Sequence, residues 1–171
     1  MTAEPQFVHL RVHTEFSLVD GMVRIGPLMQ QLKEQGMPAI ALTDQSNLFA
    51  MVKFYRAAIN NGIKPVFGVD AWVRDSTQPT GYARVVLLCQ NRTGYLNLAE
   101  LISISYREGQ HMGRACMEYD WLAERNEGLL VLSGGVEGVL GNALAQANDV
   151  LAMEQLVFWL SLIHISEPTR Q

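Results

Sequence analysis

The chain lacks the residue patterns that mark secreted and membrane-spanning proteins. Its 171 residues include two cysteines, with no CxxC pair and no cysteine–histidine cluster. This excludes a disulfide framework and a structural zinc knuckle, and it favours a reducing compartment. No apolar run approaches the ~18 residues of a membrane span, and the opening residues MTAEPQ do not resemble a signal peptide. We therefore expect a cytoplasmic protein that makes no membrane contact.

Basic residues are also few. The chain has 13 Lys and Arg against 17 Asp and Glu, which gives a net charge of -4. Binding nucleic acid through charge requires clustered Lys and Arg. This part of the chain is therefore not expected to hold DNA by itself. A composition that is 49% hydrophobic and 18% charged is typical of a globular domain with a sizeable core.

Short β-rich runs alternate with longer amphipathic stretches. The predicted strands cover residues 7–13, 39–42, 64–73, 83–89 and 128–133. The predicted helices cover residues 25–35, 48–60, 95–106, a short segment near Trp121 and two stretches beyond Val136 and Asp149. This alternation predicts an α/β fold with parallel strands and outer helices. A complete (β/α) barrel takes ~250 residues, so the sequence predicts an incomplete barrel.

Polar side chains lie near the carboxyl ends of three of the predicted strands. His13, Asp44 and Asp70 stand at strand ends, and Asp20 lies in the loop after His13. Because the carboxyl ends of parallel strands meet at one rim, these groups are candidates for a metal site. Two simpler interpretations stay open. Asp44 would serve equally well as a helix N-cap, and His13 would serve as a hydrogen-bonded structural histidine.

Several blocks of sequence occur in a recognisable order. They are residues 7–21, 36–44, 54–55, 62–68, 91–98 and 127–135. Together they resemble the polymerase and histidinol phosphatase (PHP) domain that begins the α subunit of bacterial DNA polymerase III, over about residues 6 to 150. The resemblance implies a DNA-directed DNA polymerase whose catalytic carboxylates and magnesium lie beyond residue 171, so that no residue of this chain is catalytic for nucleotide addition.

Members of this family differ in their metal content. Some bind metals and remove 3′ nucleotides, whereas others have lost the metals and serve as a platform for the proofreading exonuclease subunit. Metal-binding members carry histidines at the positions of Arg11, Gln45 and Arg84, and a glutamate at the position of Asp70. A guanidinium offers donors only, so an arginine does not ligate a metal. The resemblance therefore implies a vestigial site.

The vestigial positions are Arg11, His13, Asp20, Asp44, Gln45, Asp70 and Arg84. We expect the two arginines to neutralise the carboxylates as ion pairs, and the domain to be a metal-free scaffold. The resemblance implies that it docks the proofreading exonuclease and other replisome subunits, with DNA bound elsewhere. One alternative is an active metal-dependent phosphoesterase or 3′–5′ exonuclease that uses His13, Asp20, Asp44 and Asp70. The other is a free-standing binding module that ends near residue 171.

Two parts of the chain are distinguished. Residues 1–160 are assigned to a truncated PHP domain. Residues 161–171, SLIHISEPTRQ, are predicted to be a non-native tail, because they resemble translated sequencing-adaptor read-through at a point where the family continues toward another strand.

Overall fold

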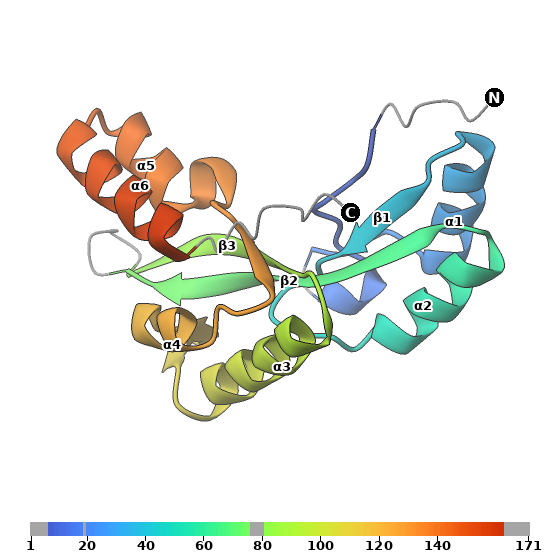
Figure 1. The fold of residues 1–171 in the computed structure, drawn as a ribbon, viewed down its shortest axis with the longest axis horizontal. Coiled ribbons are helices and arrows are strands. Elements are labelled where there is room, and N and C mark those ends of the chain that lie inside the picture. Colours follow the sequence, from blue (N-terminus) through green and yellow to red (C-terminus); the bar gives the residue numbers. More distant parts are fainter. Residues whose placement is uncertain (1–6, 19, 76–80, 163–171) are drawn as a thin grey trace, which may run out of the picture.

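The computed structural model describes residues 7–18, 20–75 and 81–162. These residues form a six-stranded sheet with helices packed around it (Figure 1). The strands are β1 (Ala39–Leu42), β2 (Lys64–Arg74), β3 (Tyr82–Cys89), β4 (Gln110–His111), β5 (Arg114–Met117) and β6 (Leu129–Leu132). The helices are α1 (Ile25–Glu34), α2 (Met51–Asn60), α3 (Arg92–Arg107), α4 (Tyr119–Glu124), α5 (Val139–Ala145) and α6 (Asp149–Leu162), with short 3₁₀ turns η1 (Glu15–Ser17) and η2 (Gly135–Glu137).

The long strand β2 connects the two halves of the molecule (Figure 1). Its first residues pair in parallel with β1, from Ala39 opposite Lys64 to Leu42 opposite Phe67. From Gly68 onward it pairs with β3 in the antiparallel direction, and its end also pairs in parallel with β5. The sheet order is β4-β5-β2-β3-β6, with β1 joined to β2 off this path.

Two main apolar clusters cover the sheet. The first places α1 and α2 against β1, with Met29, Ile40 and Phe54 fully buried. The second packs α3, α4 and α6 against β2, β3 and β6, and it includes Leu87 and Leu101. None of the described helices is long and apolar enough to cross a membrane.

The α/β class, the unclosed sheet and the outer helices are confirmed, but the sheet is mixed and not wholly parallel. β3 runs antiparallel to β2, and β6 runs antiparallel to β3. A parallel connection needs a crossover of about a dozen residues or more. The segment between Arg74 and Tyr82 is shorter than that, so these two strands form a hairpin.

The predicted strand over residues 7–13 bends at Leu10 and forms no regular ladder in the described structure. It makes one bridge, between His9 and Ile40, while the backbone N–H groups of Ala41 and Thr43 donate to the carbonyls of His9 and Val12 at 2.8 and 3.0 Å. This segment therefore still runs beside β1 and brings His13 to the carboxyl end of that strand.

Two smaller predictions are also corrected. The loop expected around residues 109–113 contains the small β4–β5 hairpin, which turns at Met112 and Gly113. The helix expected from residue 48 begins at Met51. Of the predicted non-native tail, residues 161 and 162 end α6, and residues 163–171 lie outside the described part of the chain.

The sheet is open at β6, and this has a consequence for the isolated chain. Leu130 and Leu132 are exposed, and they lie directly opposite Leu88 and Val86 on β3. Within the described residues the far edge of β6 pairs with no other strand. An unpaired edge beside an apolar face favours association between molecules.

We expect residues 1–171 expressed alone to aggregate, whereas a chain extended through a closed sheet stays monomeric. Light scattering after size-exclusion chromatography measures this. Exchanging both Leu130 and Leu132 for Lys in the short chain should reduce the aggregated fraction, while the same exchange at the exposed Val52 and Ile59 of α2 should not. A monomeric short chain with cooperative unfolding would contradict the prediction.

Candidate functional site

Asp70 is the centre of a charged cluster on β2. Its carboxylate is fully buried. Oδ2 accepts a hydrogen bond from Arg11 Nε at 2.6 Å and lies 2.9 Å from His13 Nε2. Oδ1 lies 3.1 Å from Arg84 Nη1, an ion pair without the alignment of a hydrogen bond. One carboxylate thus meets three groups that carry or can carry positive charge.

The strand geometry explains how these groups converge. Arg11 and His13 are two residues apart in an extended segment, so their side chains leave the backbone on the same side. Arg84 lies directly opposite Trp72 on β2 and diagonal to Asp70, close enough for a long side chain to reach the carboxylate. Arg84 Cζ also lies 4.2 Å from the centroid of the Trp72 ring, a cation–π contact that holds the guanidinium in place.

Two further carboxylates lie around this cluster. Asp20 Oδ2 is 2.9 Å from His13 Nδ1 and 3.7 Å from Arg84 Nη2. Glu137 Oε2 is 3.2 Å from Arg11 Nη2 and 3.7 Å from Arg84 Nε. Sequence reasoning missed Glu137. It lies in η2, directly after the glycine turn that follows β6. Its position just after a predicted strand could have identified it as a candidate.

Asp44 was predicted to belong to the same site, but it makes different contacts. Its buried carboxylate accepts hydrogen bonds from the backbone N–H and hydroxyl of Thr14 at 2.6 and 2.8 Å, and from Ser17 Oγ at 3.3 Å. Within the described residues it makes no ion pair with either arginine, so the expected pairing is wrong for this carboxylate. It is not the N-cap of α2 either, because that position is Ala50. Asp44 holds the turn that follows His13.

Gln45 lies beside the cluster without entering it. Its backbone forms a parallel bridge with Asp70, and its N–H donates to Ser17 Oγ at 2.9 Å. Of the seven sequence-predicted positions, the structure therefore gathers Arg11, His13, Asp20, Asp70 and Arg84 into one ion-pair network.

The network shifts the protonation of its members. The hydrogen bond to Asp70 raises the pKa of His13 above its ordinary 6.5, against the lowering effect of burial. Burial alone would raise the pKa of Asp70, but the hydrogen bond with His13 and the charges of Arg84 and Arg11 outweigh it and lower that pKa below 3.8. Asp70 is therefore ionised at neutral pH.

These shifts predict how stability depends on pH. Because the folded-state pKa of His13 is raised, its contribution is fully present below pH 6.5 and is lost as the pH rises through the raised pKa. The pKa of Asp70 is lowered, so its contribution is present above pH 3.8 and is lost as the pH falls through the lowered pKa. We expect His13→Gln to lower the free energy of unfolding most between pH 3.8 and pH 6.5, and to lower it less at alkaline pH. Urea unfolding across pH measures the difference, and a cost that grows with pH would refute it.

The donor set does not fit a divalent cation. Guanidinium groups have no lone pair to offer, and two of them lie against Asp70, whose Oδ2 is already engaged by Arg11 and His13. In the described ranges, no group of three or more His, Cys, Asp or Glu side chains is placed to hold a metal ion.

Comparison with known proteins places the chain in a family. Residues 9–166 match the family model of the PHP domain. The chain is 47% identical over 156 residues to DNA polymerase III subunit alpha of Pseudomonas aeruginosa, which covers 91% of this chain and 13% of that protein. It is 42% identical over 157 residues to the Escherichia coli K12 protein of the same name, covering 92% and 14%. The chain thus spans a small part of the length of these relatives.

A solved amidohydrolase from Chromobacterium violaceum superimposes with a TM-score of 0.43 at 15% identity, over 88% of this chain and 47% of that one. A score this low supports no argument about function. The family model and the polymerase relatives confirm the resemblance found in the sequence. The chain belongs to the PHP domain family.

Proposed function

We propose that this chain is the amino-terminal PHP domain of a DNA polymerase III α subunit, and that the domain is a metal-free scaffold. The observation that carries the scaffold role is the placement of Arg11 and Arg84 on the buried carboxylate of Asp70. The two arginines supply the positive charge that a metal would supply to this carboxylate. The cluster then stabilises the domain in place of binding a substrate.

The activity of the whole protein follows from the relatives, which are DNA polymerase III α subunits. In this proposal the intact protein extends DNA in the cytoplasm, with magnesium bound by a polymerase domain outside this chain. DNA binds through regions outside this chain, and the partners are the proofreading exonuclease subunit and other replisome subunits. The truncated domain of residues 1–160 and the non-native tail of residues 161–171 belong to the same proposal, and independent sequencing of the locus tests the tail.

Measuring the bound metal tests whether the domain is a metal-free scaffold. The full-length protein, purified without chelators, should extend a primer with magnesium and carry no tightly bound zinc or manganese at the PHP domain. Inductively coupled plasma mass spectrometry measures the bound metal. Two or more tightly bound ions per chain, together with a 3′ nuclease activity that His13→Ala abolishes, would replace this proposal with an active phosphoesterase.

The partner-docking role has its own test. We propose that the proofreading exonuclease subunit binds the surface of the domain and not the Asp70 cluster. Asp70 and Arg84 are buried, and the more exposed Arg11 and Glu137 are paired with each other. Reversing the charge of Arg11 should therefore leave the dissociation constant for the exonuclease unchanged once the folded fraction is taken into account. Selective loss of binding by a folded variant would place the docking face at the cluster.

A further inference from the structure

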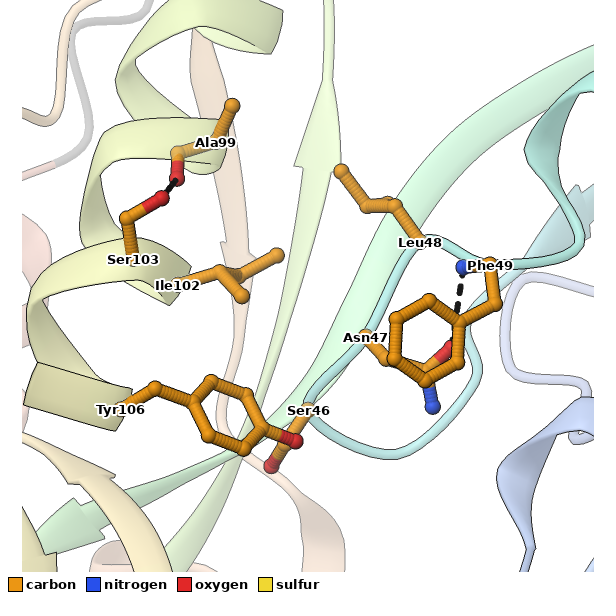
Figure 2. A pocket seen from close by; sticks show the side chains of 8 residues that line it. All are labelled: Ser46, Asn47, Leu48, Phe49, Ala99, Ile102, Ser103 and Tyr106. Atoms are coloured by element: carbon orange, nitrogen blue, oxygen red, sulfur yellow. Dashed lines mark hydrogen bonds between the residues drawn. The ribbon is translucent and has the colours of Figure 1, made fainter.

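A groove runs between residues 46–49 and α3, which we call the α3 groove (Figure 2). Its apolar lobe has a volume of about 490 Å³ and is lined by Leu48, Phe49, Ala99 and Ile102 among others. Figure 2 shows Ile102 and Tyr106 reaching from α3 toward Leu48 and Ser46 on the facing segment. No charged side chain lines this lobe in the described structure.

A smaller polar lobe of about 190 Å³ adjoins the apolar one, and both lobes share Ser46, Asn47 and Tyr106. Arg114 is the charged residue that lines this second lobe among the described residues. The two lobes together form one site with an apolar end and a cationic end.

The polar groups of the groove have bonding capacity left over. Arg114 is half-buried, and its Cζ stacks 4.3 Å from the Trp72 ring centroid and 4.8 Å from that of Tyr82. Stacking uses the face of the guanidinium and leaves its edge N–H groups for an acceptor. Within the described ranges Arg114 has no carboxylate partner. Ser46 Oγ also lacks a hydrogen-bond partner among the described residues, but it is closed off from solvent and is therefore not open to a ligand.

We propose that the α3 groove binds a peptide segment of a partner protein in which a large apolar side chain lies next to a carboxylate. The apolar side chain occupies the lobe between Leu48 and Ile102. The carboxylate accepts hydrogen bonds from the edge of Arg114. This inference goes beyond the docking role proposed above, and it holds whichever protein supplies the segment.

The shape and charge of the groove favour a peptide over other ligands. Phe49 and Tyr106 are exposed along its rim, and aromatic side chains at the edge of a groove are typical anchors of protein interfaces. Small-molecule sites enclose most of their ligand, which an open groove does not. A nucleic-acid strand requires a row of cations along its phosphates, whereas the described lining of the groove provides a single cation, Arg114.

Random dodecapeptides displayed on phage and selected on the full-length protein test this proposal. Enriched peptides should place Leu, Ile, Phe or Trp within about three residues of Asp, Glu or a free carboxyl terminus. Their dissociation constants are then measured by fluorescence anisotropy on synthetic peptides. Phe49→Ser and Arg114→Gln should each weaken binding by about tenfold or more, which corresponds to about 1.4 kcal/mol.

Two matched variants serve as controls. Leu96→Ser changes an exposed apolar residue of α3 outside the groove lining, and Arg107→Gln changes an exposed arginine of the same helix. Both should bind the peptides as the wild type does, and all four variants should keep the wild-type melting temperature, which shows that they are folded. The absence of enriched peptides, binding unaffected by Phe49→Ser or Arg114→Gln, or displacement of the peptide by a short oligodeoxynucleotide would overturn the proposal.

Discussion

Asp70→Asn is expected to lower the free energy of unfolding of the complete domain by about 3–5 kcal/mol. The substitution keeps the size of the side chain and removes its charge. Arg11, His13 and Arg84 then lose the buried carboxylate on which they converge. The cost is large because Arg84 stays buried with only its longer contacts to Asp20 and Glu137, each 3.7 Å. Arg11 and His13 keep only the partly exposed carboxylates of Glu137 and Asp20. Urea unfolding of a domain extended past residue 171 measures the effect.

The two arginines should differ in the same experiment. The Arg84 side chain is 8% exposed and that of Arg11 is 37% exposed, so solvent screens Arg11 more strongly. Arg84→Gln should cost about 3 kcal/mol, and Arg11→Gln about 1 kcal/mol. Glu100→Gln removes a carboxylate from an exposed pair with Arg125 and should leave the stability nearly unchanged. A cost for Asp70→Asn as small as that of Glu100→Gln would show that the network contributes no stability.

The second large effect is expected from restoring histidines. The combined variant Arg11→His, Gln45→His and Arg84→His should change the domain from one that retains no zinc to one that binds about one ion or more per chain. It removes both guanidinium groups from Asp70 and adds imidazole beside His13 and Asp20. Equilibrium dialysis with zinc and with manganese measures binding. A zinc concentration about a hundred times the dissociation constant should stabilise the variant by about 2.7 kcal/mol.

Arg11→His alone is the control for this experiment, because Gln45 and Arg84 still occupy two of the positions. It should bind zinc no better than the wild type. Tight binding by the single variant would show that Arg84 does not block the site. A folded triple variant that binds neither metal would show that the remaining scaffold, including the engagement of Asp44 by Thr14 and Ser17, no longer supports a metal centre.

The sequence predicted most elements because each follows from a local pattern. The apolar run of β2, the helical spacing of Ile25, Met29 and Leu32, and the glycine at position 36 just after that helix are all readable within a few residues. Residues that are close along the chain determine these features. The sequence also predicted that His13 approaches Asp70, but for an incomplete reason. Asp70 lies inside β2 and not at its end, and it is level with the residues that follow β1, where Gln45 bridges to it.

The remaining features depend on partners that are distant along the chain. The direction of β3 is set by its pairing with β2, and the role of Asp44 by the turn from Thr14 to Ser17. Glu137 reaches Arg11 across most of the chain. The sequence alone also treats Arg11 and Arg84 as equivalent, because it does not show that one is exposed and the other is stacked on Trp72. Burial and three-dimensional proximity decide these questions.

The position of β2 in both halves of the molecule has a consequence for cooperativity. The strand supplies Phe67 to the packing of the α1–α2 cluster, and Val69, Ala71 and Val73 to the other cluster. β1 pairs with residues 64–67 of this strand and β3 with residues 68–74, so the two halves join at Phe67 and Gly68 without a break in the strand. The two clusters should therefore unfold as a single foldon, and the amide protons at the centre of β2 should exchange with solvent only through global unfolding.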